Sequence, residues 1–452
     1  MTTGSRPDDL PAVIEPMLAP LLIAVLLLAP MIANAGNDKG VAVDFSALAR
    51  LDTAYELKGN RLQKSELSVS PELNVEFSRS TSLTFIGRLR FETEDLLEPG
   101  KPAQRSVSEA SQRQFLSNHL EWDLRELYVD LDWGNTFVRI GKQQIVWGQA
   151  DGLKVLDVVN PQVFREFILA EFEDSRIPLW TVNVELPVAE GTLQVLWIPD
   201  QSYNDLPEPG AAYEITAPFA GIPPDVPVTI APSDVPNRIV QDSDAGFRYS
   251  LYAGGWDLTV NYLYHYHDLP VVRRAVSPSG LLLSPSYERT HLIGGTIANA
   301  FGDFTVRGEV GWSSDAFFTQ TLATPGDGVH ESPELSSVIG LDYSGLTDTF
   351  ISGQLFQSTV LDYDSTLERS KTEMSASLLL RRNFANETLE VQLLWIQSLS
   401  GDGALIRPHL SVDYSTEWQF VLYADFFSGE SADLFGQFDE RDRIGIELTY
   451  SF

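Results

Sequence analysis

The chain has 452 residues and a formal net charge of −32, and it contains no cysteine. The absence of cysteine excludes disulfides, thiolate metal sites, cysteine nucleophiles and a lipidated amino-terminal cysteine. The acidic charge argues against nucleic acid as a partner, because nucleic-acid binding depends on Lys and Arg side chains that neutralise phosphates.

An apolar run near the amino terminus, residues 17–32, ends in Ala33-Asn34-Ala35, the small-x-small pattern that signal peptidase cuts. The run is short for a membrane-spanning helix, which needs roughly 20 residues. We therefore predict a secretory signal peptide at 1–35 and a mature protein at 36–452. The segment before the run is not basic, so a translation start at Met17 is an open alternative.

From residue 47 onward the sequence repeats one pattern, about ten residues with one apolar and one polar face, followed by a turn. The last repeat, 443–452, alternates apolar and polar residues and ends on an aromatic residue, Phe452. Eighteen such strands are predicted, with 16 as the alternative if two weak ones fail. They are expected at 47–57, 65–78, 82–94, 124–133, 136–147, 179–187, 191–199, 245–253, 256–267, 288–300, 303–313, 334–344, 347–359, 372–384, 387–399, 404–415, 417–428 and 441–452.

The connections between these strands alternate between short turns and longer links. Gly134-Asn135 and Gly254-Gly255 are short, whereas 95–123, 148–178 and 200–244 are long. This alternation is typical of a transmembrane β-barrel with tight periplasmic turns and long external loops. The predicted fold class is therefore all-β, a transmembrane antiparallel β-barrel of about 18 strands in the outer membrane.

Eight of the nine tryptophans lie near predicted strand ends, as aromatic girdles at the two membrane interfaces require, and only Trp395 lies deeper. The alternative is a soluble β-sandwich or propeller with tryptophans in its core. Sandwich strands are shorter, and no blade-length repeat is present, so the membrane barrel is favoured. Its expected partners are membrane lipid and the outer-membrane insertion machinery, for which Phe452 is the predicted assembly signal.

Charged side chains on the polar strand faces are expected to line the pore, where rings of charge govern ion passage. Pairing across neighbouring strands is the favoured role for most of them. Lys142 and Gln143 are both polar although adjacent positions should face opposite sides, so a β-bulge near Gly141 is one explanation, and Lys142 is not assigned to the pore. The predicted pore-lining residues are Arg88, Arg90, Glu126, Asp130, Asp132, Arg139, Arg307, Glu309, Arg407 and His409.

Two long links carry further features. In 148–178, Asn160-Pro161 predicts a helix start, followed by an apolar stripe opposite polar residues that include Arg165 and Glu166. This helix either folds inward as a constriction loop or caps the outer rim, and both interpretations stay open. The link 200–244 contains eight prolines and is predicted to be an irregular external loop, with a plain surface loop favoured over a lid or partner-binding loop.

No enzymatic activity, cofactor or metal site is predicted. His409 and Ser411 lie two apart on one strand face, as in the HxS arrangement of outer-membrane phospholipases, where a base must reach a serine nucleophile. Here both project with Arg407 on the presumed water side, whereas a lipid-cleaving site belongs on the membrane face. Acidic loop residues such as Asp439 are more often solvated than metal-binding.

The stretch Arg139–Pro161, RIGKQQIVWGQADGLKVLDVVNP, with the RELYVDL strand before it, resembles a family of Gram-negative outer-membrane barrel proteins without an assigned function. The shared pattern is a G-K-Q-x-x-x-W-G strand end followed by an acidic loop that reaches an N-P. The resemblance implies a porin-like protein that works beside an inner-membrane exporter of the resistance-nodulation-division class, which moves hydrophobic cargo.

The sequence thus predicts a porin-like channel for the passage of solutes across the outer membrane. One alternative is the outer port of an export route for hydrophobic cargo, which aromatic side chains along the lumen would favour. The other is a structural or adhesive barrel with partner-binding loops, which a plugged bore would favour.

Overall fold

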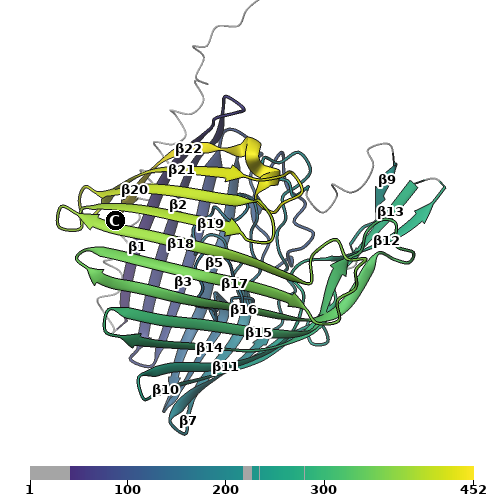
Figure 1. Ribbon diagram of the computed structural model, residues 1–452. Coiled ribbons are helices and arrows are strands. Elements are labelled where there is room, and N and C mark those ends of the chain that lie inside the picture. The colour runs from purple at the N-terminus through teal and green to yellow at the C-terminus, as the bar shows by residue number, and fades with distance from the viewer. Residues whose placement is uncertain (1–40, 217–225, 234, 279) are drawn as a thin grey trace, which may run out of the picture.

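In the computed structural model, which describes residues 41–216, 226–233, 235–278 and 280–452, eighteen antiparallel strands form one closed barrel (Figure 1). The barrel closes where β1 (Ala42–Glu56) pairs with β22 (Arg443–Ser451). Closure leaves no strand edge unpaired, which is what a sheet in lipid requires. The predicted signal peptide, 1–35, lies outside the described residues.

The prediction of 18 strands is confirmed, and most boundaries agree within a few residues. The other barrel strands are β2 (Arg61–Ser78), β3 (Thr81–Glu92), β5 (Leu120–Trp133), β6 (Thr136–Gln143), β7 (Leu179–Val188), β8 (Gly191–Ile198), β10 (Asp244–Ala253), β11 (Trp256–Tyr266), β14 (Arg289–Phe301), β15 (Phe304–Thr319), β16 (Val329–Leu346), β17 (Thr349–Val360), β18 (Thr372–Phe384), β19 (Leu389–Ser398), β20 (Ala404–Asp413) and β21 (Trp418–Ser428).

Short turns and long loops lie at opposite ends of the barrel, as the sequence predicts. Gly134 and Gly254, in two of the short turns, have φ of +65° and +59°, the left-handed conformation that two-residue hairpins need. At the long-loop end, β9 (Val228–Ile230), β12 (Val271–Ser277) and β13 (Gly280–Ser286) form a separate three-stranded sheet that projects away from the wall (Figure 1). Within the described part of the chain, the remaining elements are the two-residue strand β4 (Gln114–Phe115) and the 3₁₀ helix η2 (Gly436–Arg441).

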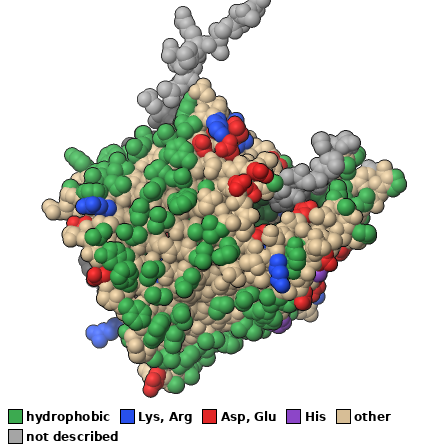
Figure 2. Space-filling view, in the orientation of Figure 1, with side chains coloured by type: hydrophobic (Ala, Val, Ile, Leu, Met, Phe, Trp, Pro, Cys, Tyr) green, Lys and Arg blue, Asp and Glu red, His purple; other side chains and the backbone are tan. Residues whose placement is uncertain are grey.

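The outer wall carries the apolar half of the alternating pattern. Figure 2 shows hydrophobic side chains over much of the barrel wall, with few charged ones among them. Such a surface suits acyl chains, because a lipid-facing strand surface must be apolar. No helix among the described residues is long and apolar enough to cross a membrane. The exposed apolar residues of the strands include Leu51, Ile140, Val195, Val260, Ile293, Ile339, Val391, Leu422 and Ile446.

The predicted helix at Asn160-Pro161 is wrong, because residues 161–178 form turns and isolated bridges instead. The buried Asn160 side chain does not cap a helix. Its Oδ1 accepts the backbone N–H of Ile145 at 2.7 Å, and its Nδ2 donates to the carbonyl of Ile177 at 2.8 Å. Phe167 has a φ of +55°, which an α-helix does not permit.

Two further expectations near the end of β6 need correction, namely the girdle position of Trp147 and the extension of the strand to residue 147. Trp147, assigned from its position to an interfacial girdle, is only 2% exposed, and its Nε1 donates to Gln194 Oε1 at 2.8 Å inside the protein. The strand already ends at Gln143, so the chain turns inward before reaching Trp147. Trp133, by contrast, is 83% exposed at a strand end.

Candidate functional site in the lumen

The barrel interior holds a cavity of about 1100 Å³ beside a segment that folds inward from the wall. This segment, residues 144–178 between β6 and β7, is called the inner loop below. It includes the predicted link 148–178 and begins four residues earlier, because β6 ends at Gln143. Strands β1 to β3 and β19 to β22 contribute the opposite cavity wall.

Arg165 ties the inner loop to strands β2 and β3. Its guanidinium lies 2.9 Å from Glu66 and 2.8 Å from Glu98, and it also contacts Glu92. All four side chains are largely buried. Buried charges are tolerated when they are paired and hydrogen-bonded, so this group fixes the loop rather than repelling it.

Glu166, the next residue, turns to the seam of the barrel. Its carboxylate lies 2.6 Å from Lys64 on β2 and 2.7 Å from Arg443 on β22. Burial by itself would raise the pKa of the Glu166 carboxyl, but Lys64, Arg443 and the adjacent Arg165 hold that pKa well below its usual range. The carboxylate therefore stays ionised and anchors the loop across the β22–β1–β2 junction.

Asp174 makes a third anchor further along the inner loop. It lies 2.7 Å from Arg50 on β1 and 3.1 Å from Arg88 on β3. Burial opposes ionisation, whereas Arg88 and Arg50 lower the pKa of the Asp174 carboxyl far below its ordinary value. One carboxylate of the loop thus bridges β1 and β3, which lie on either side of β2.

The start of the inner loop is held by other strands. Asp151 lies 2.7 Å from Arg307 on β15 and accepts a hydrogen bond from Gln354 on β17 at 2.8 Å. Glu309, also on β15, accepts the backbone N–H of Leu156 at 3.2 Å. The loop starts at β6 and reaches strands β15, β17, β22, β1 and β3, so it crosses the bore.

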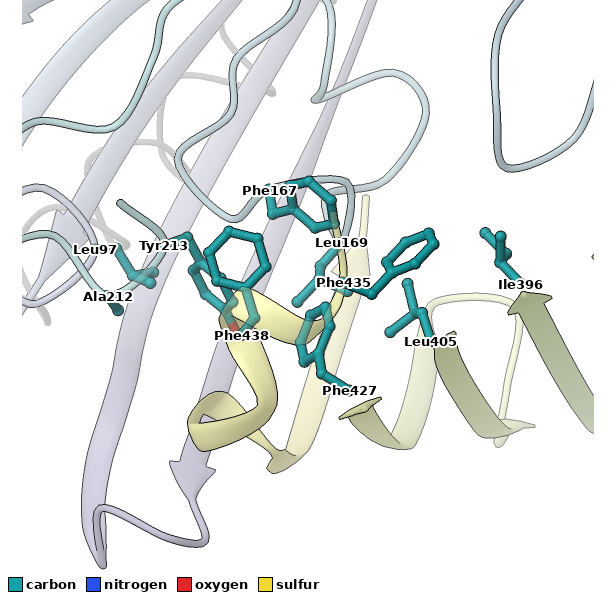
Figure 3. Close-up of a cluster of buried hydrophobic side chains, with 10 residues drawn as sticks. All are labelled: Leu97, Phe167, Leu169, Ala212, Tyr213, Ile396, Leu405, Phe427, Phe435 and Phe438. Carbon is teal, nitrogen blue, oxygen red and sulfur yellow. The ribbon is translucent and has the colours of Figure 1, made fainter. Parts of the chain in front are cut away.

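An apolar cluster packs the middle of the inner loop against the long-loop end of the wall (Figure 3). Phe167 lies with its ring centroid 4.8 Å from that of Phe438 in η2 and 6.3 Å from that of Phe427 on β21. Phe167, from the apolar stripe expected of a helix, is therefore buried, and Phe164 and Ile168 of the same stripe are partly buried against the cluster, although no helix forms. The other members of the cluster are Leu97, Leu169, Ala212, Tyr213, Ile396, Leu405 and Phe435.

Four of the predicted pore-lining residues border the cavity. Arg88 and Arg90 lie on one side, and Arg90 pairs with Glu98 at 2.8 Å and Glu121 at 2.7 Å. On the other side, Arg407 and His409 project from β20.

Arg407 also contacts the inner loop directly. It pairs with Asp425 at 2.8 Å and donates to the carbonyl of Leu169 at 2.8 Å. His409 stacks obliquely near Tyr423, with ring centroids 5.8 Å apart, and no hydrogen bond among the described residues joins it to Ser411. The HxS pair is therefore not arranged as a base and nucleophile.

The other predicted pore residues lie on the strands but do not line this cavity. Asp130 and Arg139 are opposite each other on β5 and β6 and form a double hydrogen bond at 2.7 and 2.8 Å, a cross-strand pair. Asp132 is exposed beside the Gly134 turn, and Glu126 is half-buried. Arg307 and Glu309 hold the inner loop, as described above. The predicted loop residues Asn160, Arg165 and Glu166 all border the cavity.

Several cavity residues escaped the sequence reasoning. Arg50 and Arg443 occupy polar positions of β1 and β22 beside apolar residues, and this alternation is the available signal. Lys64 on β2 lies between Gln63 and Ser65, so the alternation does not mark it. Arg125 and Lys142 had no such signal, because both sit where the alternation breaks. Lys142, which the sequence pattern does not assign to the pore, also borders the cavity.

Comparisons with known proteins agree with the architecture. The structure of Pseudomonas aeruginosa OccK2 (OpdF) has 12% sequence identity and a TM-score of 0.52, covering 91% of this chain and 97% of that one. Acinetobacter baumannii OccAB1 has 10% identity and a TM-score of 0.51, with 92% and 98% covered. At such identities the likeness concerns the fold, which is that of outer-membrane porins.

No curated protein matches the sequence. A family model does match, over residues 35–452, which is nearly the whole chain. The match does not test the G-K-Q-x-x-x-W-G pattern itself. The chain belongs to the family described as protein of unknown function DUF1302.

Proposed function

We propose that this protein is an outer-membrane channel through which small polar solutes pass, with the inner loop narrowing the bore. The observation that carries the proposal is the charged cavity beside a loop held across the lumen. Eleven of the 31 Lys and Arg residues and thirteen of the 63 Asp and Glu residues border it. A lumen with charges of both signs keeps water in the passage and suits polar solutes.

The balance of charge in the cavity differs from that of the whole chain. The chain carries a net charge of −32, whereas the charges of the eleven basic and thirteen acidic side chains that border the cavity nearly cancel. Basic side chains are therefore concentrated inside the barrel. A solved structure of similar fold, Pseudomonas aeruginosa OccK2 (OpdF), is a complex with glucuronate, which is a polar solute of the proposed size class.

An export route for hydrophobic cargo is the second candidate, and it would act with an inner-membrane exporter. It calls for aromatic side chains that face an open passage. The aromatic group around Phe167 and Phe438 packs against itself and the wall, with both residues at most 4% exposed. This packing favours the polar solute. The adhesive barrel remains the outcome to expect if the bore is plugged.

Passage can be measured by the swelling of liposomes that contain the refolded protein. Sugars of increasing size should enter at falling rates, and removing residues 160–170 should raise the rates for the larger ones, because the loop narrows the bore. Liposomes that swell no faster than protein-free ones would contradict the channel. Equal rates before and after the deletion would contradict the narrowing by the inner loop.

A further inference from the structure

Two adjacent irregularities in the barrel wall bring Arg125 and Lys142 toward the same part of the lumen. The register of β3 against β5 shifts between Ile86 and Gly87, and Arg125 is the extra residue on β5. On β6, Gly141 has a φ of +139°, and a Cβ there would lie 2.1 Å from a backbone oxygen of β5. Glycine alone fits this position, and the altered backbone turns the next side chain, Lys142, inward.

Lys142 carries a buried ammonium group without a carboxylate partner. Its side chain borders the cavity although the residue is only 1% exposed. Among the described residues, no carboxylate oxygen lies within 4.0 Å of Nζ, and its hydrogen bond to the carbonyl of Ser111 is 3.5 Å long. An ammonium group has three hydrogen-bond donors, and buried charges are normally paired, so Nζ of Lys142 can still donate to a further acceptor.

Two carboxylates, Asp123 and Asp174, face these cations, and Asp123 contacts two of them. Its Oδ2 lies 3.1 Å from Arg88 and 3.4 Å from Arg125, and Lys142 interacts with it electrostatically over a longer distance. Arg88 also reaches Asp174, but Arg50 shares that carboxylate. All of the cations around Asp123 border the cavity.

We propose that Arg88, Arg125 and Lys142 form a subsite for the carboxylate of a small solute in the lumen. Arg125 already donates to the carbonyls of Glu173 and Arg176 at 2.9 Å each. The solute carboxylate therefore meets the remaining guanidinium donors of Arg88 and Arg125 together with the ammonium of Lys142. The solute supplies the carboxylate partner that Lys142 lacks among the described residues. This inference rests on the proposed function for the route of the solute, and it deepens that function by naming organic acids as the substrate class.

Glucuronate and glucose provide the test, because they share a sugar ring and differ in the carboxylate. Each is titrated calorimetrically into the refolded full-length barrel in detergent at low ionic strength. Glucuronate should give saturable heat and glucose none at equal concentrations. Lys142→Gln should weaken glucuronate binding at least about tenfold, the effect of one lost charge-assisted hydrogen bond. The matched control, Arg139→Gln, removes a lumen cation outside the cavity and should change affinity by less than about twofold.

Asp123→Asn provides a change of opposite sign. Removing the competing carboxylate should strengthen glucuronate binding several-fold, a result that a folding defect does not produce. Equal heats from glucuronate and glucose in the unaltered protein would overturn the inference, and so would unchanged affinity in both the Lys142→Gln and Asp123→Asn variants. Calorimetry needs no passage, so a failure of the channel in the swelling assay stays distinguishable from a failure of this subsite.

Discussion

Glu166→Gln should loosen the inner loop. The carboxylate contacts Lys64 at 2.6 Å and Arg443 at 2.7 Å, with all three side chains less than a tenth exposed. Breaking a buried ion pair costs roughly 3–5 kcal/mol. Lys64 keeps Asp52 at 2.7 Å and Arg443 keeps Asp425 at 2.7 Å, so we expect the low end, about 3 kcal/mol.

Hydrogen exchange followed by mass spectrometry measures this cost directly. A loss of about 3 kcal/mol in the free energy of local opening lowers amide protection in peptides covering 160–170 roughly 100-fold. Glu171→Gln is the matched control, since Glu171 is exposed in the same loop and forms no ion pair within 4.0 Å among the described residues. Protection that stays within about threefold of the unaltered protein in Glu166→Gln would refute the anchoring role.

Three other changes have defined outcomes. Gly141→Ala should lower the free energy of unfolding, measured by denaturant titration, by at least about 1–3 kcal/mol, because a φ of +139° is strained for any residue with a side chain. Gly353→Ala is the control and should leave the free energy of unfolding unchanged, because open space surrounds Gly353. The pKa values of the Glu166 and Asp174 carboxyls are lowered in the folded protein, so the stability that these groups contribute is complete above their unfolded pKa values and is lost as the pH falls below about 4. Equal amide protection of the inner loop at pH 3 and pH 7 would contradict this. Phe452→Ser should reduce the amount of barrel in the outer membrane, assayed by membrane fractionation and heat-modifiability, and wild-type levels would show that Phe452 is not the assembly signal.

The strands were predictable because their information is local. Alternation of apolar and polar residues sets which face meets lipid, and it locates the strands despite local breaks at Arg125 and Gly141. The site was less accessible, because its contacts join distant parts of the chain. Glu166 and Arg443 are separated by 277 residues, and no local pattern reports that they meet.

Two of the mispredictions, the helix at Asn160-Pro161 and the omission of Lys142 from the pore, share one physical cause. The stripe that includes Phe167 was read as one face of a helix, but the segment satisfies its apolar groups by packing on η2 and β21 instead. Lys142 was passed over because alternation fails after Gly141, where the backbone departs from regular strand geometry. Periodicity assumes a regular backbone, so it loses its value at the irregular positions that shape the lumen.

Single-channel recording in a planar bilayer tests the central claim most directly. The purified, folded barrel should give steady ohmic steps, and Glu166→Gln should increase or destabilise the conductance because the inner loop loses an anchor. A reversal potential in a salt gradient would then report which lumen charges dominate. A folded, heat-modifiable barrel that gives no conductance steps would contradict the account of this protein as a channel.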